Sequence, residues 1–191
     1  YKIIGNDDYA LFSPTDVPTL ASNQDIVETA TNGVYEIRTG GTYSGDGDAE
    51  KVNGSAGKDI ISGGGGNDII NAGDGSDWIS GGAGNDKLSG GLGSDTFAWT
   101  LADQGTATNP AMDAILDFNT ASRAAGGDVL DLRDLLSGTA TTAATLDNYL
   151  DFAKSGSDTV INVRPDGALG SVTQKIVLTN VDLTSNSTLN D

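Results

Sequence analysis

Residues 54–98 read GSAGKDIIS GGGGNDIIN AGDGSDWIS GGAGNDKLS GGLGSDTFA, a stretch that divides into five consecutive units of nine residues. Each unit follows the pattern G-G-x-G-x-D-x-U-x, where U is a large apolar residue, with one departure each in the first and third units. A single unit this short cannot bury its apolar side chain alone. A repeat of fixed period therefore indicates one small structural element stacked on copies of itself.

The eighth place of every unit is apolar, and the fourth is always glycine. One core residue in nine predicts a three-residue strand, with turns between strands. Glycine at the fourth place permits a positive φ, or lets carbonyl oxygens crowd around one point. We predict an all-β chain built on a parallel β-roll, with flanking β-strand caps and one or two short helices. The apolar residues are Ile61, Ile70, Ile79, Leu88 and Phe97, and the glycines are Gly57, Gly66, Gly75, Gly84 and Gly93.

The sixth place is always aspartate: Asp59, Asp68, Asp77, Asp86 and Asp95. If each unit makes half a coil, units two apart stack, and the aspartates form two columns. Stacked strands lie about 4.8 Å apart. Two negative charges at about 5 Å repel by about 3 kcal/mol at an effective dielectric constant near 20. The columns therefore require cations between their members, and three pairs of units two apart supply a complete pair of aspartates.

The ligand chemistry selects the cation. The chain contains neither Cys nor His, so carboxylate and carbonyl oxygens are the natural donors. A hard, all-oxygen ligand set favours Ca²⁺ over zinc or copper, and peptide carbonyls suit Ca²⁺ better than the tight octahedron of Mg²⁺. We predict several Ca²⁺ ions, held by the five aspartate side chains. The predicted carbonyl ligands are those of Gly54, Ala56, Gly57, Gly63, Gly65, Gly66, Ala72, Gly73, Asp74, Gly75, Gly82, Gly84, Gly91 and Gly93.

The segment before the first unit, GDGDAEKVN at residues 45–53, is a degenerate copy. It keeps Gly47 and the apolar Val52 in phase but has Glu50 at the sixth place. We therefore take Glu50 as a further candidate ligand, completing a half site with Asp68. An EF-hand interpretation of the same acidic residues fails, because the glycine required at loop position six is replaced by Lys51.

The rest of the chain divides around the repeats. Residues 1–44 contain short strand patterns (YKII, YALF, GVYEIR) and are predicted to be a β cap or the end of a preceding domain. Residues 45–98 form the roll, and residues 99–191 a β-rich C-terminal capping region. In that region Thr145 is expected to cap a short helix that gathers Leu146, Tyr149 and Leu150 on one face. DTVINV, PDG and QKIVLTNVDL then read as strand, turn and strand.

Composition excludes several functions. The formal net charge of -17 argues against nucleic acid or an anionic membrane as partner. No apolar run approaches the roughly 18 residues that span a bilayer, so we expect no membrane insertion. Without His or Cys there is no catalytic triad, thiol nucleophile or ordinary catalytic zinc site, and we predict that the chain is not an enzyme. Because it begins at Tyr1, we expect a piece of a longer protein, monomeric as a fragment.

The nonapeptide is the known signature of calcium-binding RTX β-helices. GGAGNDKLSGGLGSDTFAW, followed by MDAILDFNTASRAAGGDVLDLRDLL, resembles the C-terminal RTX and secretion-target region of giant bacterial adhesins exported by type I secretion. The resemblance covers roughly residues 54–184. It implies that the module leaves a Gram-negative cell unfolded through the type I secretion machinery, folds on extracellular Ca²⁺, and is secreted or held at the cell surface.

The resemblance also implies additional calcium ligands near the end of the roll. They would be Asp117, Asp128 and Asp131, with Asp113 as a weaker candidate. The alternative is that these aspartates are solvated residues of a capping segment, whose core is formed by Leu130, Leu132 and Leu135.

Two other functions stay open. The roll is a candidate ligand-binding module for glycan or peptide, with Trp78 and Trp99 as stacking residues, although no regular Thr array for ice binding exists on its outer faces. It is also a candidate for the non-catalytic tail of a secreted RTX enzyme, since such repeats also follow catalytic domains.

Overall fold

The computed structural model describes residues 2–4, 26–28, 33–136 and 143–184. Almost all regular structure in this part of the chain is β, and two short 3-10 helices complete it. The elements are β1 (Lys2–Ile4), β2 (Ile26–Glu28), β3 (Val34–Ile37), β4 (Thr42–Ser44), β5 (Lys51–Asn53), β6 (Ile60–Ser62), β7 (Ile69–Asn71), β8 (Asp74–Gly75), β9 (Trp78–Ser80), β10 (Lys87–Ser89), β11 (Leu92–Gly93), β12 (Thr96–Ala98), β13 (Ala111–Ile115), η1 (Arg123–Ala125), β14 (Val129–Asp131), η2 (Ala143–Asn148), β15 (Leu150–Ser155), β16 (Asp158–Val163) and β17 (Gln174–Leu178).

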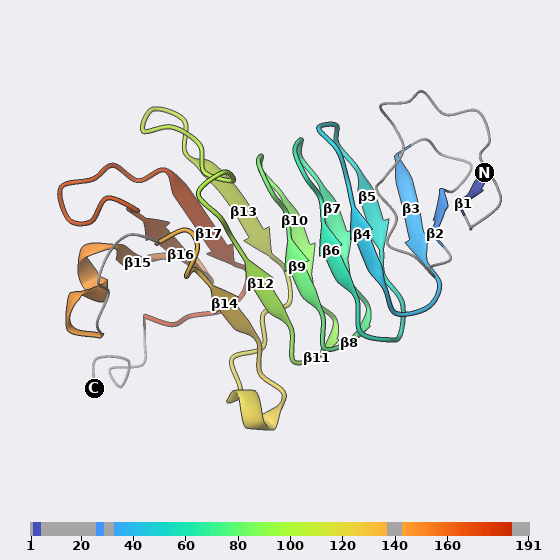
Figure 1. Cartoon of the computed structure of the whole chain (residues 1–191). Helices are drawn as coiled ribbons and strands as arrows, with labels where there is room; N and C mark the ends of the chain where they lie inside the picture. The colour runs from blue at the N-terminus through green and yellow to red at the C-terminus, as the bar shows by residue number, and fades with distance from the viewer. Residues whose placement is uncertain (1, 5–25, 29–32, 137–142, 185–191) are drawn as a thin grey trace.

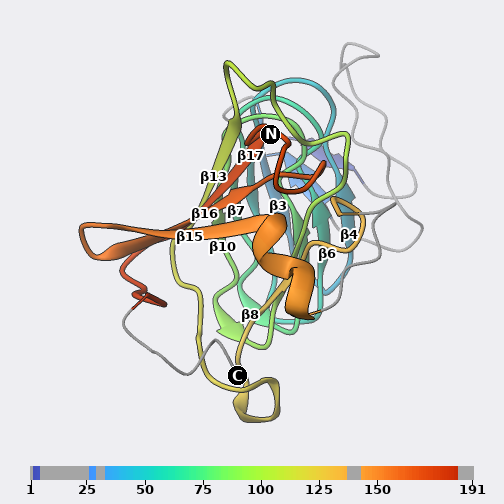
Figure 2. The same cartoon turned by 90° about the vertical axis from the view of Figure 1, so that its left-hand side faces the viewer.

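Two sheets, whose strands are parallel within the roll, face each other, as the views across and along the axis of the roll show (Figures 1 and 2). The five-stranded sheet has the order β14-β12-β9-β6-β4, and the ten-stranded sheet runs β1-β2-β3-β5-β7-β10-β13-β17-β16-β15. Within the repeats, Ile61 pairs with Ile79, and Ile70 pairs with Leu88. Paired residues are thus two units apart. The predicted half coil per unit and the parallel β-roll are confirmed.

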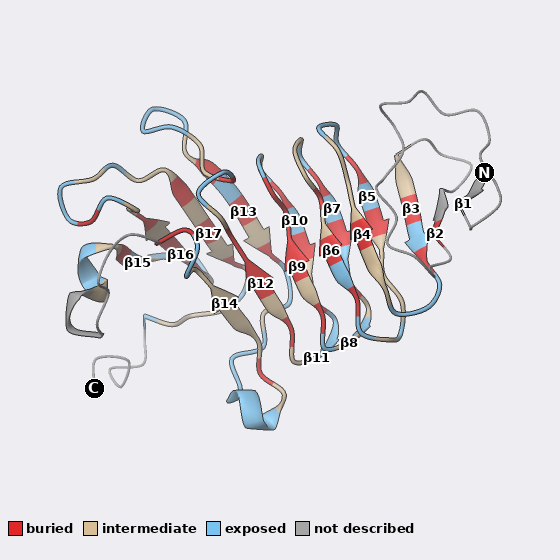
Figure 3. Ribbon diagram, in the orientation of Figure 1, coloured by how far each residue is buried: buried red, intermediate tan, exposed pale blue. Residues whose placement is uncertain are grey.

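The eighth-place residues form the centre of the core between the two sheets (Figure 3). All five are buried, and Tyr43 and Val52 continue the same rows into the N-terminal part. Burying a side chain of this size stabilises the fold by about 1.5–3 kcal/mol. Each coil supplies only two such residues, so stability accumulates coil by coil.

The fourth-place glycines are required by the stacking of the turns. Gly66, Gly75, Gly84 and Gly93 have positive φ, as predicted, whereas Gly57 does not. A Cβ on Gly84 would lie 1.5 Å from the carbonyl oxygen of Gly66 in the preceding turn. A Cβ on Gly57 would meet nothing closer than 3.3 Å. Glycine is therefore needed at the fourth place of a unit when the turn one coil earlier packs directly against it.

Coiling continues on both sides of the repeats. Beyond them, β13 pairs in parallel with β10, and β14 pairs in parallel with β12. Before them, β3 pairs with β5 and β4 with β6, also in parallel. The first strands, β1 and β2, then join the ten-stranded sheet in antiparallel orientation. The sequence pattern YALF lies outside the described residues.

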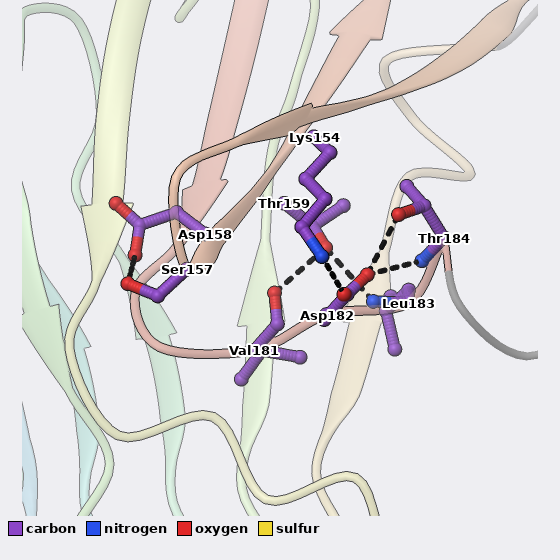
Figure 4. A network of polar contacts seen from close by, with 8 residues as sticks. All are labelled: Lys154, Ser157, Asp158, Thr159, Val181, Asp182, Leu183 and Thr184. Carbon is purple, nitrogen blue, oxygen red and sulfur yellow. Dashed lines mark hydrogen bonds and ion pairs between the residues drawn. The ribbon is translucent and has the colours of Figure 1, made fainter.

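The C-terminal region ends the roll with an antiparallel hairpin. β15 and β16 turn at Gly156, and β16 pairs with β17, which lies parallel to β13. The segment that follows β17 is hydrogen-bonded to this hairpin (Figure 4). Thr159 Oγ1 donates to Val181 O at 2.7 Å and accepts from Leu183 N–H at 2.9 Å, while Lys154 forms an ion pair with Asp182. The predicted strand–turn–strand of this region is present.

The short helix near residue 145 differs from the expectation. η2 is a 3-10 helix that begins at Ala143, so Thr145 lies within it and not at its N-cap. Leu150 is the first residue of β15, because it pairs with Val163. Leu146 and Tyr149 are partly buried and pack against the core. No helix in the described part of the chain is long and apolar enough to cross a membrane.

Candidate calcium sites

The sixth-place carboxylates form two continuous ladders along the roll. In each step, one oxygen of an aspartate accepts the backbone N–H of the residue one coil earlier. Asp59 N–H donates to Asp77 Oδ1, and Asp77 N–H donates to Asp95 Oδ1, both at 2.8 Å. The second ladder contains the same bond from Asp68 N–H to Asp86 Oδ1, also at 2.8 Å. The two predicted columns are therefore present, and each aspartate has one oxygen fixed by the backbone.

The other carboxylate oxygen is left without a partner in most of these residues. Among the residues that the structure describes, five buried carboxylate oxygens have no hydrogen-bond partner, and all five belong to sixth-place residues. An unpaired buried polar atom is costly, and an unpaired charge more so. These oxygens therefore require a cation or a proton. They are Glu50 Oε2, Asp68 Oδ2, Asp77 Oδ2, Asp86 Oδ2 and Asp95 Oδ2.

The unpaired oxygens lie beside carbonyl oxygens of the glycine turns. A Cβ built on Gly63 would be 2.2 Å from Asp68 Oδ2 and 2.5 Å from the carbonyl oxygen of Gly81. Oxygens this close to one point can be bridged by a single Ca²⁺, whose bonds to oxygen are about 2.3–2.6 Å long. The residues present therefore fit calcium in donor type, because each site pairs an unpaired carboxylate oxygen with a nearby carbonyl oxygen.

Carbonyl oxygens are an essential part of these sites. Within the described residues, no three carboxylates gather closely enough to hold a metal by themselves. The carbonyl of Gly81 is absent from the ligands predicted from the sequence, although its place in the unit matches that of Gly63 and Ala72. Of the predicted carbonyls, that of Gly73 already accepts the Leu92 N–H at 3.0 Å. The full carbonyl ligand set stays a prediction.

The electrostatics of the columns favour a bound cation. Burial raises the pKa of Asp77 to about 6, and the neighbouring charges of Asp95 and Asp59 add to the effect. Burial likewise raises the pKa of Asp68 to about 6, with a contribution from the charge of Asp86. The N–H bonds within the ladders act in the opposite direction without cancelling the shift. Charging these columns therefore costs free energy unless a cation is bound.

Asp59 differs from the other repeat aspartates. Its Oδ1 accepts the Gly41 N–H at 2.6 Å, and its Oδ2 accepts both the N–H and the hydroxyl of Ser55, at 2.7 and 2.9 Å. Ser55 stands where the other units have glycine, and it supplies donors to the carboxylate. Asp59 is in the predicted column, but its oxygens already have protein partners.

The two ladders end at Asp113 and Asp128. Asp86 N–H donates to Asp113 Oδ1, and Asp95 N–H donates to Asp128 Oδ1, at 2.8 and 3.0 Å. Both residues thus occupy the sixth place of a final coil. Their outer oxygens are taken by protein donors: Asp113 Oδ2 accepts from Trp99 Nε1 at 2.7 Å and from Gln174 Nε2 at 2.8 Å. Asp128 Oδ2 accepts the backbone N–H of Asn119 at 2.8 Å.

The remaining C-terminal candidates lie outside the ladders. Asp117 accepts from the backbone of Gly90 and Gly91, both at 3.0 Å, and so caps the last glycine turn. Asp131 forms an exposed ion pair with Arg133, which lowers its pKa. Their role as calcium ligands stays a prediction, and every one of these C-terminal carboxylates already has partners in the protein.

Sequence reasoning named Asp113 and Asp128 but missed that they end the ladders, and it missed Trp99 and Gln174 as donors to Asp113. Asp113 is 27 residues after Asp86, and Asp128 is 33 residues after Asp95, so counting in steps of 18 does not reach them. Trp99 was a candidate for stacking on a sugar, but it is 1% exposed, so its ring packs in the core while its N–H bonds Asp113. Trp78 lies on the outer face of β9 and is partly exposed.

The parallel sheets, the stacked glycine turns and the buried oxygen sites together define a calcium-binding β-roll. Residues 44–79 and 63–97 match the family described as the RTX calcium-binding nonapeptide repeat. This part of the chain is therefore an RTX calcium-binding repeat module, and the matched family is a calcium-binding repeat, not a catalytic domain. No curated protein matches the sequence.

Solved structures with the same fold support this class. The AlgE6R2 subunit of the Azotobacter vinelandii mannuronan C5-epimerase is 27% identical, with a TM-score of 0.55, covering 80% of this chain and 89% of that one. The AlgE6R3 subunit of the same enzyme is 26% identical, with a TM-score of 0.54, covering 75% of this chain and 83% of that one. The chain is thus similar to the repeat subunits of an epimerase over most of its length.

Proposed function

We propose that this module is a calcium-gated folding unit of a surface adhesin that Gram-negative bacteria export by type I secretion. The observation that carries the proposal is the set of buried carboxylate oxygens without partners, stacked in two columns. Such columns are stable only when they are neutralised. Binding of Ca²⁺ then becomes free energy of folding.

The repulsion between the unneutralised carboxylates also explains export. At low intracellular Ca²⁺ the columns repel, the chain stays unfolded, and it can pass through a narrow channel. Outside the cell, calcium neutralises the columns and the roll folds. RTX repeats are typical of secreted extracellular proteins, and the secretion-target resemblance of residues 54–184 supports this route.

A second candidate is the non-catalytic tail of a secreted enzyme. It is favoured by the similar solved structures, which are named as subunits of a mannuronan C5-epimerase. In both cases the module itself binds calcium and folds on it. The two candidates differ in the domain attached to it, and in what that domain acts on or adheres to.

The test is a titration of chelator-stripped protein with Ca²⁺, followed by far-UV circular dichroism, with Mg²⁺ at equal ionic strength as the control. A cooperative coil-to-β transition with Ca²⁺ alone supports the proposal. A chain that is already β-rich without calcium refutes calcium-gated folding. An epimerisation and hydrolysis assay on uronate polysaccharides, with and without Ca²⁺, checks the non-catalytic role, and calcium-dependent turnover would contradict it.

A further inference from the structure

The degenerate segment at residues 45–53 folds as a complete unit of the roll. It lacks the fourth-place glycine and the sixth-place aspartate, yet its turn stacks like those of the repeats. Gly65 N–H donates to Asp46 O at 2.6 Å. The next turn of the same column contains the equivalent bond, from Ala83 N–H to Gly64 O at 2.8 Å. The repeat conformation therefore extends one unit before the repeat pattern begins.

Glu50 occupies the place of the aspartate in this unit. Its N–H donates to Asp68 Oδ1 at 2.8 Å, and its side chain is buried, with Oε2 unpaired. A Cβ on Gly45 would lie 2.5 Å from Glu50 Oε2 and 2.0 Å from the carbonyl oxygen of Gly63. The same construction on Gly63 gives 2.2 Å to Asp68 Oδ2 and 2.5 Å to the carbonyl of Gly81. The longer glutamate thus recreates the oxygen arrangement of a repeat site.

A second carboxylate lies in the same turn as Glu50. Asp46 stands at the second place of the unit, and its Oδ1 accepts the backbone N–H of Asp48 at 2.9 Å. In the first repeat the second-place residue reaches the sixth-place carboxylate of its own turn, because the Ser55 hydroxyl donates to Asp59 Oδ2 at 2.9 Å. The corresponding pair in this turn is Asp46 and Glu50, and two carboxylates placed side by side require a cation or a proton between them.

The side chain of Asp46, at the second place of its unit, fits only at this end of the column. In the following turns the second place is glycine, because the carbonyl of the preceding turn fills the space. A Cβ on Gly82 would lie 2.0 Å from Gly64 O, and one on Gly64 would lie 2.2 Å from Asp46 O. By contrast, Asp46 does not have the positive φ of Gly64 and Gly82, so its backbone accepts a side chain. Asp46 can therefore carry a carboxylate where the repeats cannot.

We propose that the turn Gly45–Glu50 holds a calcium site of its own, in which the carboxylates of Asp46 and Glu50 act together with the carbonyl of Gly63. The inference rests on the proposed function, since it deepens calcium binding by the roll. The pair of ligands on one turn is absent from the nonapeptide pattern. Its all-oxygen donors and two carboxylates are those that Ca²⁺ prefers. A filled site would join the first coil to the repeats.

The test counts bound calcium by atomic emission after equilibrium dialysis of the full chain at saturating Ca²⁺. The variants are Glu50→Gln and Asp46→Asn, which keep the side-chain shape and remove the charge. Asp48→Asn is the matched control, because its exposed side chain lies on the same turn. We expect both test variants to hold one ion fewer per chain than wild type and Asp48→Asn, while circular dichroism shows the roll still folded.

Equal ion counts in wild type and Glu50→Gln would overturn the inference, because Glu50 would then be a buried protonated acid. If Glu50→Gln does not fold at saturating Ca²⁺, Asp46→Asn decides, since the Asp46 side chain is only half-buried. Wild type that takes up no calcium refutes the proposed function itself. Wild type that takes up calcium with no loss in either variant refutes this site alone.

Discussion

Replacing Asp77 with Asn should have opposite effects with and without calcium. Asp77 is central to its column, because its Oδ1 accepts the Asp59 N–H and its own N–H donates to Asp95. Its Oδ2 is buried and unpaired. Asparagine keeps the volume and the Oδ1 acceptor, and it replaces the unpaired oxygen with an amide nitrogen that cannot bind calcium. The substitution therefore removes one charge and one predicted ligand with little change in shape.

The magnitude follows from burial and charge. In calcium, removing one member of a buried charged cluster costs about 3 kcal/mol. Shared among the three ions predicted from the three complete pairs of repeat aspartates, this is about 1 kcal/mol per ion, or a roughly fivefold rise in the calcium midpoint of folding. Without calcium the sign reverses. The raised pKa of Asp77, about 6, means that its charge destabilises the metal-free roll by about 3 kcal/mol at neutral pH.

The assay is a calcium titration followed by circular dichroism, with Asp74→Asn as the control. Asp74 is in the same unit, but its side chain is exposed, so this control removes the same charge without removing a predicted side-chain ligand. We expect the midpoint to rise for Asp77→Asn alone, and residual β structure in chelator to be equal or greater than in wild type. Equal midpoints in the two variants would refute the assignment of Asp77 as a ligand.

Three further predictions concern acid, the glycine turns and the closed end of the roll. Because the pKa of Asp77 is raised in the fold, protonation stabilises the metal-free roll fully below about pH 4, and this contribution is lost as the pH rises through about 6. Circular dichroism in chelator should therefore show more β structure at about pH 5 than at neutral pH, and an unchanged spectrum would contradict this. Gly84→Ala should lower the melting temperature in calcium by the equivalent of about 3 kcal/mol, because Gly84 has positive φ and its Cβ would collide with the preceding turn. Gly47→Ala, whose Cβ would meet no atom of the described residues within 4 Å, should leave the melting temperature unchanged. Similar melting temperatures for the two variants would disprove the stacking argument. Trp99→Phe should cost about 1–3 kcal/mol in urea unfolding by removing a donor to Asp113, with no change in bound calcium, and a lost ion would mean that Asp113 is a ligand.

The regular part of the roll could be predicted from the nine-residue period of the sequence alone. The eighth-place apolar residues and the sixth-place aspartates recur every nine residues, and a parallel pairing of units two apart follows from that period. The ladders and the buried core confirm this interpretation. Asp113 and Asp128 were harder to place, since loops of irregular length separate them from the repeats. Counting could not show that they continue the columns.

The sequence by itself determined the fold class, the two columns and the nature of the cation, because each depends on residue type and period. Which oxygens are left for calcium was decided by tertiary structure. Asp59 and Asp113 have the same carboxylate as Asp77, but Ser55, Trp99 and Gln174 lie close enough to donate hydrogen bonds to them. We expect calcium at the carboxylates whose second oxygen the folded chain leaves unpaired, and that depends on distant residues which the local pattern does not encode.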